Sequence, residues 1–463
     1  MWDDLKLPRQ FAYGQLDAAL TPLRIPLDNY AQMDGVNEFQ VDIGYFFDEH
    51  MGVSKPTWLR NIWQNDLADA PFSGEVKRDL LRWRNAPAES SEQFRRKLDT
   101  MTYRDFLEKE MGLRPEVTKY IEPVVGLING ASPDAVSAFA AQQIGMPGVS
   151  RPRGRTGGLP QSFPGGNGTY ARHFVKYLMP DAIAGESTFE NLLTAQVNLA
   201  ALDRPAQPTR MRVGATVVRV EHAAAAGSAD RVVIHYEKGG VVHRVQARAA
   251  VMASGGWINK HVIADLPTEM KAAYGDFVYS PALVVNVALT NWRFLYKLGA
   301  PSCRWFGDDF GFTCNIRRPM LAGTHRIPLH PDQPTVLTFY MGLYSPGRPA
   351  YEQGVLARAR LFAAMYADYE RTIRSHMVRL FSEYGFDPRK DIAGIILNRW
   401  GHARLVQPPG FYYGKDGKPA GRQIIEKGFG RIAIGHSELN GHQSVTGAIA
   451  QGKRAAEQVV ALG

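Results

Sequence analysis

The sequence has little cysteine and none of the spacings that bind metal through cysteine and histidine. Its 463 residues include only two cysteines, Cys303 and Cys314, and no CxxC or CxxCH motif. A structural zinc site and a covalently attached haem are therefore not expected, because both need closely spaced ligands. The two thiols could form one disulfide, but two unconnected buried thiols are the simpler expectation. We predict no metal site.

Long hydrophobic runs are also absent. No apolar stretch approaches the roughly 18 residues that span a bilayer, so the sequence predicts no transmembrane segment. The opening stretch MWDDLKLPRQF starts with acidic residues and has no apolar centre, which is not the pattern of a signal peptide. The expected compartment stays open: the cytoplasm, or the periplasm if a signal lies upstream of Met1.

The sequence lacks a concentrated positive charge as well. The formal net charge is +9, from 54 Lys and Arg against 45 Asp and Glu, yet the basic residues are spread along the chain. The densest cluster, RPRGRTGG at residues 151–158, is typical of a solvated loop. Net charge alone would suit a nucleic-acid partner, but this distribution does not, and none is predicted.

Patterns of hydrophobicity divide the chain into four expected regions. The first is mostly helical, and the second carries a glycine-rich turn, a helix and a β-meander. The third mixes sheet and helix, and the last closes the chain as strand, turn and helix. Their expected bounds are 1–150, 151–262, 263–400 and 401–463. This order predicts an α+β or α/β fold with interleaved domains.

Several elements are predicted within these regions. Serines in capping positions open expected helices over residues 90–112 and 132–148. Three β-rich runs after Arg210 predict a three-stranded meander. A long helix is expected over residues 351–384, and a strand over residues 392–400.

The closing stretch, GRIAIGHSELNGHQSVTGAIAQGKRAAEQVV, carries the most information. Its apolar RIAIG predicts a buried strand, followed by Ser437 and Glu438, and a helix is expected to begin near Ser444. Ligands of α/β sheets bind at the carboxyl ends of strands. The first amides of a helix and its positive dipole end suit an anionic group. A well-packed terminal helix without a ligand is the alternative interpretation.

This stretch resembles the C-terminal flavin-binding segment of the amine oxidase superfamily. Further stretches are similar, in order and spacing, to spermidine-dehydrogenase-like FAD proteins. They are DIGYFFDEHMG, TYRDFLEKEMG, FPGGNGTYARHFVKYLMPDAIAG, NLAALDRPAQPTRMRVGATVVRVEH and LNRWGHA. The resemblance runs from about Asp42 to the end of the chain. It implies an FAD-linked amine-oxidase-type fold with interleaved FAD-binding and substrate domains.

The resemblance also implies which residues contact the cofactor. Glu438 would bond the ribityl chain of the flavin, and the start of the last helix would approach the ring. The implied contacts also include a glycine-rich turn and a valine of the meander, whose backbone would contact the adenine. The implied residues are Gly165, Gly166, Val217, Ser437, Glu438, Ser444, Val445 and Thr446. Two of them depart from the subfamily, which has an aromatic residue in place of Ser444 and an aspartate in place of Glu438.

The implied reaction is oxidation of an aliphatic, polyamine-like amine to an imine and then an aldehyde, with hydride transfer to the flavin. Trp400 and His402 are the candidate catalytic residues, expected to form a wall facing the ring. Tyr340 and Trp257 are further aromatic candidates. For each of these a purely structural role is the alternative interpretation. The resemblance also allows a non-covalent haem, which some relatives hold.

One motif of the superfamily is missing. Its flavoproteins open with a strand and GxGxxG, whose glycines let the pyrophosphate reach a helix N-terminus. The glycine-rich PGGNG of this chain follows a proline-rich loop, not a strand. We therefore expect the first βαβ unit to be absent, and to lie upstream of Met1 in a longer protein or on a separate chain. The alternative function is a non-catalytic partner subunit or a remnant of a split flavoprotein.

Overall fold

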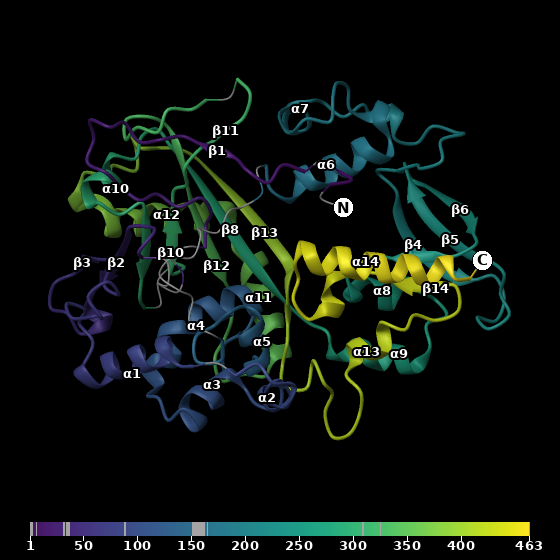
Figure 1. The fold of residues 1–463 in the computed structure, drawn as a ribbon, viewed down its shortest axis with the longest axis horizontal. Coiled ribbons are helices and arrows are strands. Elements are labelled where there is room, and N and C mark those ends of the chain that lie inside the picture. Colours follow the sequence, from purple (N-terminus) through teal and green to yellow (C-terminus); the bar gives the residue numbers. More distant parts are fainter. Residues whose placement is uncertain are drawn as a thin grey trace.

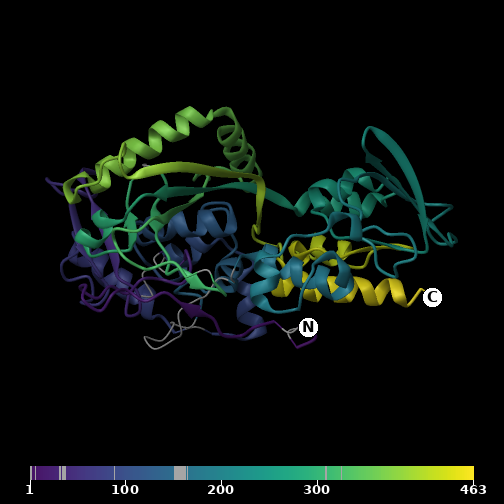
Figure 2. The same cartoon turned by 90° about the horizontal axis from the view of Figure 1, so that it is seen from above.

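The computed structural model describes the chain in two parts that lie side by side (Figures 1 and 2). One part is built around a large sheet, and the other holds smaller sheets and the C-terminal helix. The described residues are 3–5, 7–30, 33, 38–87, 89–150, 163, 165–307, 310–324 and 326–462. The basic cluster at 151–158 lies outside them.

The large sheet has seven strands in the order β13-β8-β12-β10-β9-β2-β3. Every neighbouring pair is antiparallel except β2 with β9. Its strands are β2 (Ile43–Phe47), β3 (Thr57–Arg60), β8 (Val278–Leu289), β9 (Ser302–Trp305), β10 (Thr313–Asn315), β12 (Thr335–Gly342) and β13 (Ile392–Val406). The strand expected over residues 392–400 is confirmed and continues to Val406, past a bulge between Trp400 and Arg404.

Two helices cover one face of this sheet. They are α11 (Ala350–Ala363) and α12 (Tyr366–Phe381), whose apolar residues Leu361, Met377 and Phe381 belong to the same buried cluster as Val285 and Val287 of β8. The single helix predicted over residues 351–384 is therefore wrong. The chain breaks at Ala364 and Met365, and the backbone N–H of Met365 donates to Asp368 in the first turn of α12.

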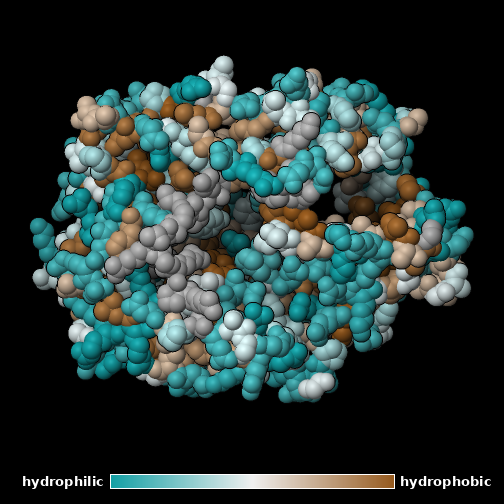
Figure 3. All heavy atoms as spheres, viewed as in Figure 1, coloured by the Kyte–Doolittle hydropathy of each residue, from teal (hydrophilic) through white to brown (hydrophobic). Residues whose placement is uncertain are grey.

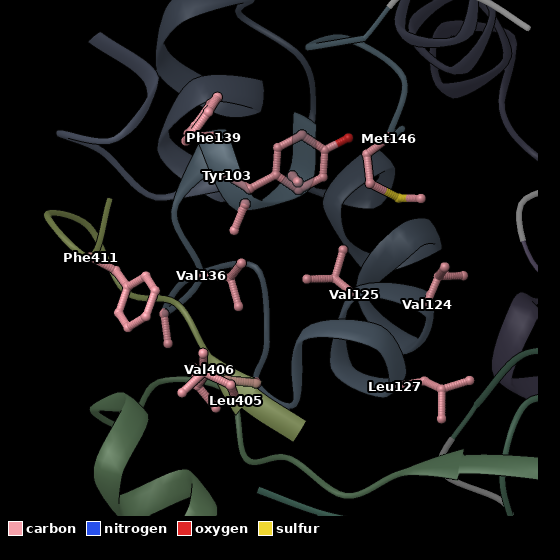
Figure 4. Packing of buried hydrophobic residues seen from close by; sticks show 14 of the residues in the cluster. Tyr103, Val124, Val125, Leu127, Val136, Phe139, Met146, Leu405, Val406 and Phe411 are labelled. Atoms are coloured by element: carbon pink, nitrogen blue, oxygen red, sulfur yellow. The ribbon is translucent and has the colours of Figure 1, made fainter. Parts of the chain in front are cut away.

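The remaining helices near the large sheet share its core, part of which Figure 4 shows. They are α1 (Gly74–Asn85), α2 (Glu92–Leu98), α3 (Tyr103–Asp105), which runs into a π-helical turn, α4 (Pro115–Asn129) and α5 (Ala138–Gln143). The short helix α10 (Arg293–Leu298) belongs instead to the buried cluster of α11 and α12. The strands β1 (Ala12–Tyr13) and β11 (Met320–Leu321) form a separate antiparallel sheet of two strands. The helix predicted over residues 132–148 is wrong in its start, because Ser137 caps α5 and Ser132 instead bonds the side chain of Gln353.

The second part contains the predicted meander, which is confirmed as antiparallel β4 (Thr216–His222), β5 (Val232–Lys238) and β6 (Val241–Ala247). The last predicted run continues into β7 (Ala250–Met252), which leaves the meander and pairs in parallel with β14 (Ile432–Ile434). The helices here are α6 (Asn167–Leu178), α7 (Phe189–Thr194), α8 (Gly256–Val262), α9 (Thr268–Ala273), α13 (Gly421–Ile425) and α14 (Val445–Val460).

The two cysteines face each other across β9 and β10, and both are buried free thiols. Over the described ranges, no group of histidine, cysteine and acidic side chains is arranged to hold a metal ion. Of the described helices, none is both long enough and apolar enough to cross a membrane.

Candidate functional site

The closing strand, turn and helix have the predicted order. The buried strand β14 runs into a 3-10 turn, η7 (Ser437–Asn440), and then into α14. Ser444 caps this helix, since its Oγ accepts a hydrogen bond from the N–H of Gly447 at 3.0 Å. The predicted start near Ser444 is thus confirmed. Val445 and Thr446 form the open first turn, and the side chain of Thr446 is exposed.

Glu438 is fully buried and joins three elements. Its Oε1 accepts a hydrogen bond from the N–H of Gly256, at the start of α8, at 2.7 Å. Its Oε2 accepts one from the hydroxyl of Tyr279, on β8, at 2.7 Å. Burial and then the charge of Glu438 raise the pKa of Tyr279 far above its usual value, so Tyr279 remains a donor. Both carboxylate oxygens are thus bonded within the protein, and the ribityl role of Glu438 stays a prediction.

Three strands of the large sheet present a mixed aromatic and polar surface on the side away from α12. Cross-strand partners point to the same side of a sheet, and residues two apart share that side. Asn398 pairs with Val284, which pairs with Tyr340, and Trp400 pairs with Ala282. We call this surface the Trp400 face; its side chains are Ile396, Asn398, Trp400, Ala282, Val284, Asn286, Thr338 and Tyr340.

The two candidate catalytic residues separate at the bulge of β13. Trp400 lies on the Trp400 face with 60% of its surface exposed. His402 instead stacks on Trp257 of α8, with ring centroids 4.0 Å apart and an interplanar angle of 5°. Burial and then the positive charge of Arg358 lower the pKa of His402, which keeps its imidazole neutral at physiological pH. Trp257 therefore contacts the ring of His402 and does not belong to the Trp400 face.

Tyr340 has an aromatic partner that the sequence did not indicate. Tyr30, from the N-terminal region, lies against it with ring centroids 5.4 Å apart. Burial, and then the neighbouring Tyr340, raise the pKa of Tyr30 to about 12. Neither Tyr30 nor Tyr279 stands in a recognisable motif, so only the folded chain reveals them.

The loop before α14 is attached to the end of β13. The N–H of Leu405 donates to Oε1 of Gln443 at 2.8 Å, and the hydroxyl of Tyr412 donates to the carbonyl of Gly441 at 3.1 Å. The first turn of α14 is thereby held beside the strand that carries the Trp400 face. Figure 3 shows the surface hollowed in the middle of this view, beside the beginning of α14.

The remaining predicted cofactor residues lie in the second part. Gly165 and Gly166, just before α6, both have a φ of +72°. A Cβ on Gly165 would lie 2.2 Å from Oγ1 of Thr169, so packing requires glycine there, whereas the space around Gly166 is open. Val217 stands on β4, opposite Tyr236, and is exposed. Ser437 is half-buried beside Glu438.

Comparison with protein-family models and with curated protein sequences found no match. Among solved structures, putrescine oxidase bound to putrescine is 13% identical with a TM-score of 0.54, over 99% of this chain and 84% of that one. Cyclohexylamine oxidase from Brevibacterium oxydans is 16% identical with a TM-score of 0.50, over 91% and 80%. The chain has the amine oxidase fold. The predicted mixed α/β class is confirmed; the interleaved domains and the absent βαβ unit stay predictions.

Proposed function

We propose that this chain forms part of an FAD-dependent enzyme that oxidises an aliphatic amine to an imine, which water converts to an aldehyde. The observation that carries the proposal is the attachment of the first turn of α14 to the end of β13. The bond from Leu405 to Gln443 ties the loop before Val445 and Thr446 to the strand that carries the Trp400 face, which supports a shared site for their amides, the positive end of the helix and the aromatic face. The amine oxidase fold supports the same assignment.

The residues fit the cofactor at separate points. Ser444 caps the N–H of Gly447, so the amides of Val445 and Thr446 remain for an anionic or carbonyl oxygen. Gly166 offers open space in front of α6. FAD, once bound, supplies the two-electron acceptor that amino acid side chains lack. The chain itself would contribute aromatic contact for the amine through Trp400 and Tyr340, and exclusion of water.

We further propose that this chain works as part of a longer protein or with a second chain. Within the described residues, β7 and β14 form a parallel sheet of only two strands. Parallel sheets are ordinarily larger and covered on both faces. A further strand, from an upstream segment or a separate chain, would complete this sheet together with the pyrophosphate site. Nothing in the described residues supports a haem.

The test uses the native protein isolated from its own cells. We expect its mass to exceed that of this chain, or a second chain to accompany it, and its absorption spectrum to contain a flavin band. Under anaerobic conditions an aliphatic amine should bleach that band, whereas the matching alcohol should not. A folded native protein without flavin would contradict the cofactor. Bleaching by alcohols or acids, and by no amine, would contradict the substrate class.

The finer expectation of a polyamine-like substrate is tested with putrescine and spermidine in the same panel. A cationic amine near aromatic rings gains cation–π contact, which Trp400 and Tyr340 would supply. Turnover should rise with pH, because the neutral amine is the form that is oxidised.

A further inference from the structure

Arg404 extends the Trp400 face beyond the bulge of β13. It pairs with Ser280 of β8, while Trp400 pairs with Ala282, two residues further along the same strand. Because Ser280 and Ala282 point to the same side, so do their partners. The bulge inserts extra residues into β13 between Trp400 and Arg404, yet both side chains point to the same side of the sheet. The face therefore ends in an arginine, at the end of β13 that is attached to the loop before α14.

The guanidinium of Arg404 is only partly used by the protein. Its Nε donates to the carbonyl of Leu127, at the end of α4, at 3.0 Å. Among the described residues it makes no further side-chain hydrogen bond, and no carboxylate lies within ion-pair distance of it. The residue is half-buried. Its two terminal nitrogens are thus donors with a fixed geometry and no acceptor in the described part of the chain.

Positive charge predominates around Arg404; the one nearby carboxylate that the described residues show is Asp28, which accepts a hydrogen bond from the N–H of Tyr30 at 2.9 Å. The side chains that define the Trp400 face include no carboxylate. The carboxylate of Glu438 is buried and bonded to Gly256 and Tyr279. Burial lowers the pKa of His442, just before α14, and the charge of Arg404 lowers it further. The positive end of α14 adds to this field. A polycation would be repelled here, whereas an anionic group would be attracted.

We propose that Arg404 binds a carboxylate of the substrate, so that the amine oxidised is an amino acid or another amine bearing a carboxylate. The inference rests on the proposed amine oxidation and narrows its substrate class. The planar guanidinium fork matches the two oxygens of a carboxylate. Trp400 and Tyr340, on the same face, hold the aliphatic part of such a substrate. Arg404 is a specificity residue and takes no part in electron transfer.

The experiment compares two substrates that differ only in the carboxylate, ornithine and putrescine, on the native flavin-loaded enzyme. We expect ornithine to have the higher kcat/KM. Arg404→Leu should lower kcat/KM for ornithine about 10- to 100-fold, the range for losing a hydrogen bond to a charged group, and leave putrescine almost unchanged. Arg404→Lys should have a kcat/KM for ornithine between those of the wild type and of Arg404→Leu. Arg399→Leu, an exposed arginine on the opposite side of β13, is the matched control and should change neither.

A binding measurement accompanies the kinetics. Pentanoate should raise the melting temperature of the wild type and of Arg399→Leu, but not that of Arg404→Leu, while pentylamine should not distinguish the three. A preference for putrescine that Arg404→Leu leaves unchanged would overturn the inference and leave amine oxidation standing. Equal losses for both substrates, with a shifted flavin potential, would place Arg404 at the cofactor and also overturn it. If neither substrate bleaches the flavin, and no other amine does, the proposed function itself fails.

Discussion

The carboxylate of Glu438 and the hydroxyl of Tyr279 lie 2.7 Å apart, and their hydrogen bond joins the turn before α14 to β8 of the large sheet. Glu438 has no exposed surface; its carboxylate also accepts from the N–H of Gly256, and Nδ1 of His436 lies 3.4 Å from its Oε2. A buried charge without partners is strongly destabilising. The bond therefore fixes the last turn and helix against the strands that carry the Trp400 face.

Tyr279→Phe should destabilise the protein because it removes one of the two donors to Glu438. The expected loss is about 1–3 kcal/mol in the free energy of unfolding, measured by urea denaturation near pH 7. Tyr412→Phe is the matched control, since it removes a bond from a buried tyrosine to a neutral carbonyl, that of Gly441. Its loss should be smaller, about 1 kcal/mol. Equal stability of Tyr279→Phe and wild type would show that Glu438 does not need this donor.

Thr446→Pro should weaken flavin binding without unfolding α14. Thr446 is the second residue of the helix and its side chain is exposed, and proline is tolerated in the first turn. The substitution removes one amide that the proposal assigns to the cofactor. We expect the flavin-to-protein ratio after dialysis to fall clearly, with an unchanged circular dichroism spectrum. Thr446→Ala keeps the amide and should keep the flavin. Full flavin retention in Thr446→Pro would remove this amide from the site.

Trp400→Ala should raise KM and lower kcat for amines, by about tenfold in kcat/KM, because an aromatic contact with the substrate is lost. Ile396→Ala is the control on the same face: this exposed side chain, with 64% of its surface accessible, lies one row beyond Asn398. It should have little effect. The measurement is steady-state oxidation with an artificial electron acceptor. An unchanged kcat/KM in Trp400→Ala would assign this tryptophan to the surface or to a partner chain.

Local patterns in the sequence predicted the elements that depend on neighbouring residues. The spacing of polar and apolar residues within a few positions predicts three of them: the cap of α14 by Ser444, the three meander strands, and the strand beginning at Ile392. The break between α11 and α12 was missed because neither proline nor glycine marks it. There the N–H of Met365 donates a hydrogen bond to the side chain of Asp368. An aspartate three residues into a helix is too common in sequences to identify a helix start.

The site could be predicted only in part, because its contacts connect distant segments. Tyr279 and Glu438 are 159 positions apart, and no local pattern links them. The bulge in β13 separates Trp400 from His402 and returns Arg404 to the face of Trp400. Strict alternation would have put Trp400 and His402 on one side. The position of a bulge depends on pairing with β8, which the sequence of β13 alone does not contain.

Glu38 should make the protein less stable as pH rises from about 4.5 to about 7. It is fully buried, and its Oε2 accepts from the N–H of Trp63 at 2.8 Å. Burial raises its pKa from 4.5 to about 7. Between these values the folded state keeps a proton that the unfolded state has released, so stability is lost as pH rises, by about 3 kcal/mol in all. Glu38→Gln stays neutral and should lose this slope in urea denaturation. Glu116→Gln, at an exposed position, should keep it.

His376 should make the protein less stable as pH falls, the opposite of the effect of Glu38. It is buried against Trp305, with ring centroids 4.8 Å apart. Burial, and then the charge of Arg379, lower its pKa from 6.5 to about 3. Between these values the unfolded state binds a proton that the folded state refuses, so stability is lost as pH falls, by roughly 5 kcal/mol in all.

His376→Phe keeps an aromatic ring beside Trp305 but cannot titrate, so its stability should fall less steeply below pH 6.5 than that of the wild type. The exposed His261, changed to glutamine, is the control and should leave the slope unchanged. The measurement is the free energy of unfolding from urea titrations at several pH values between about 4 and 8. Because Glu38 and His376 have opposite slopes where their windows overlap, each single variant should expose the slope of the other residue. Parallel pH profiles for wild type and His376→Phe would show that His376 has the same pKa in the folded and the unfolded protein and would contradict the lowering by burial.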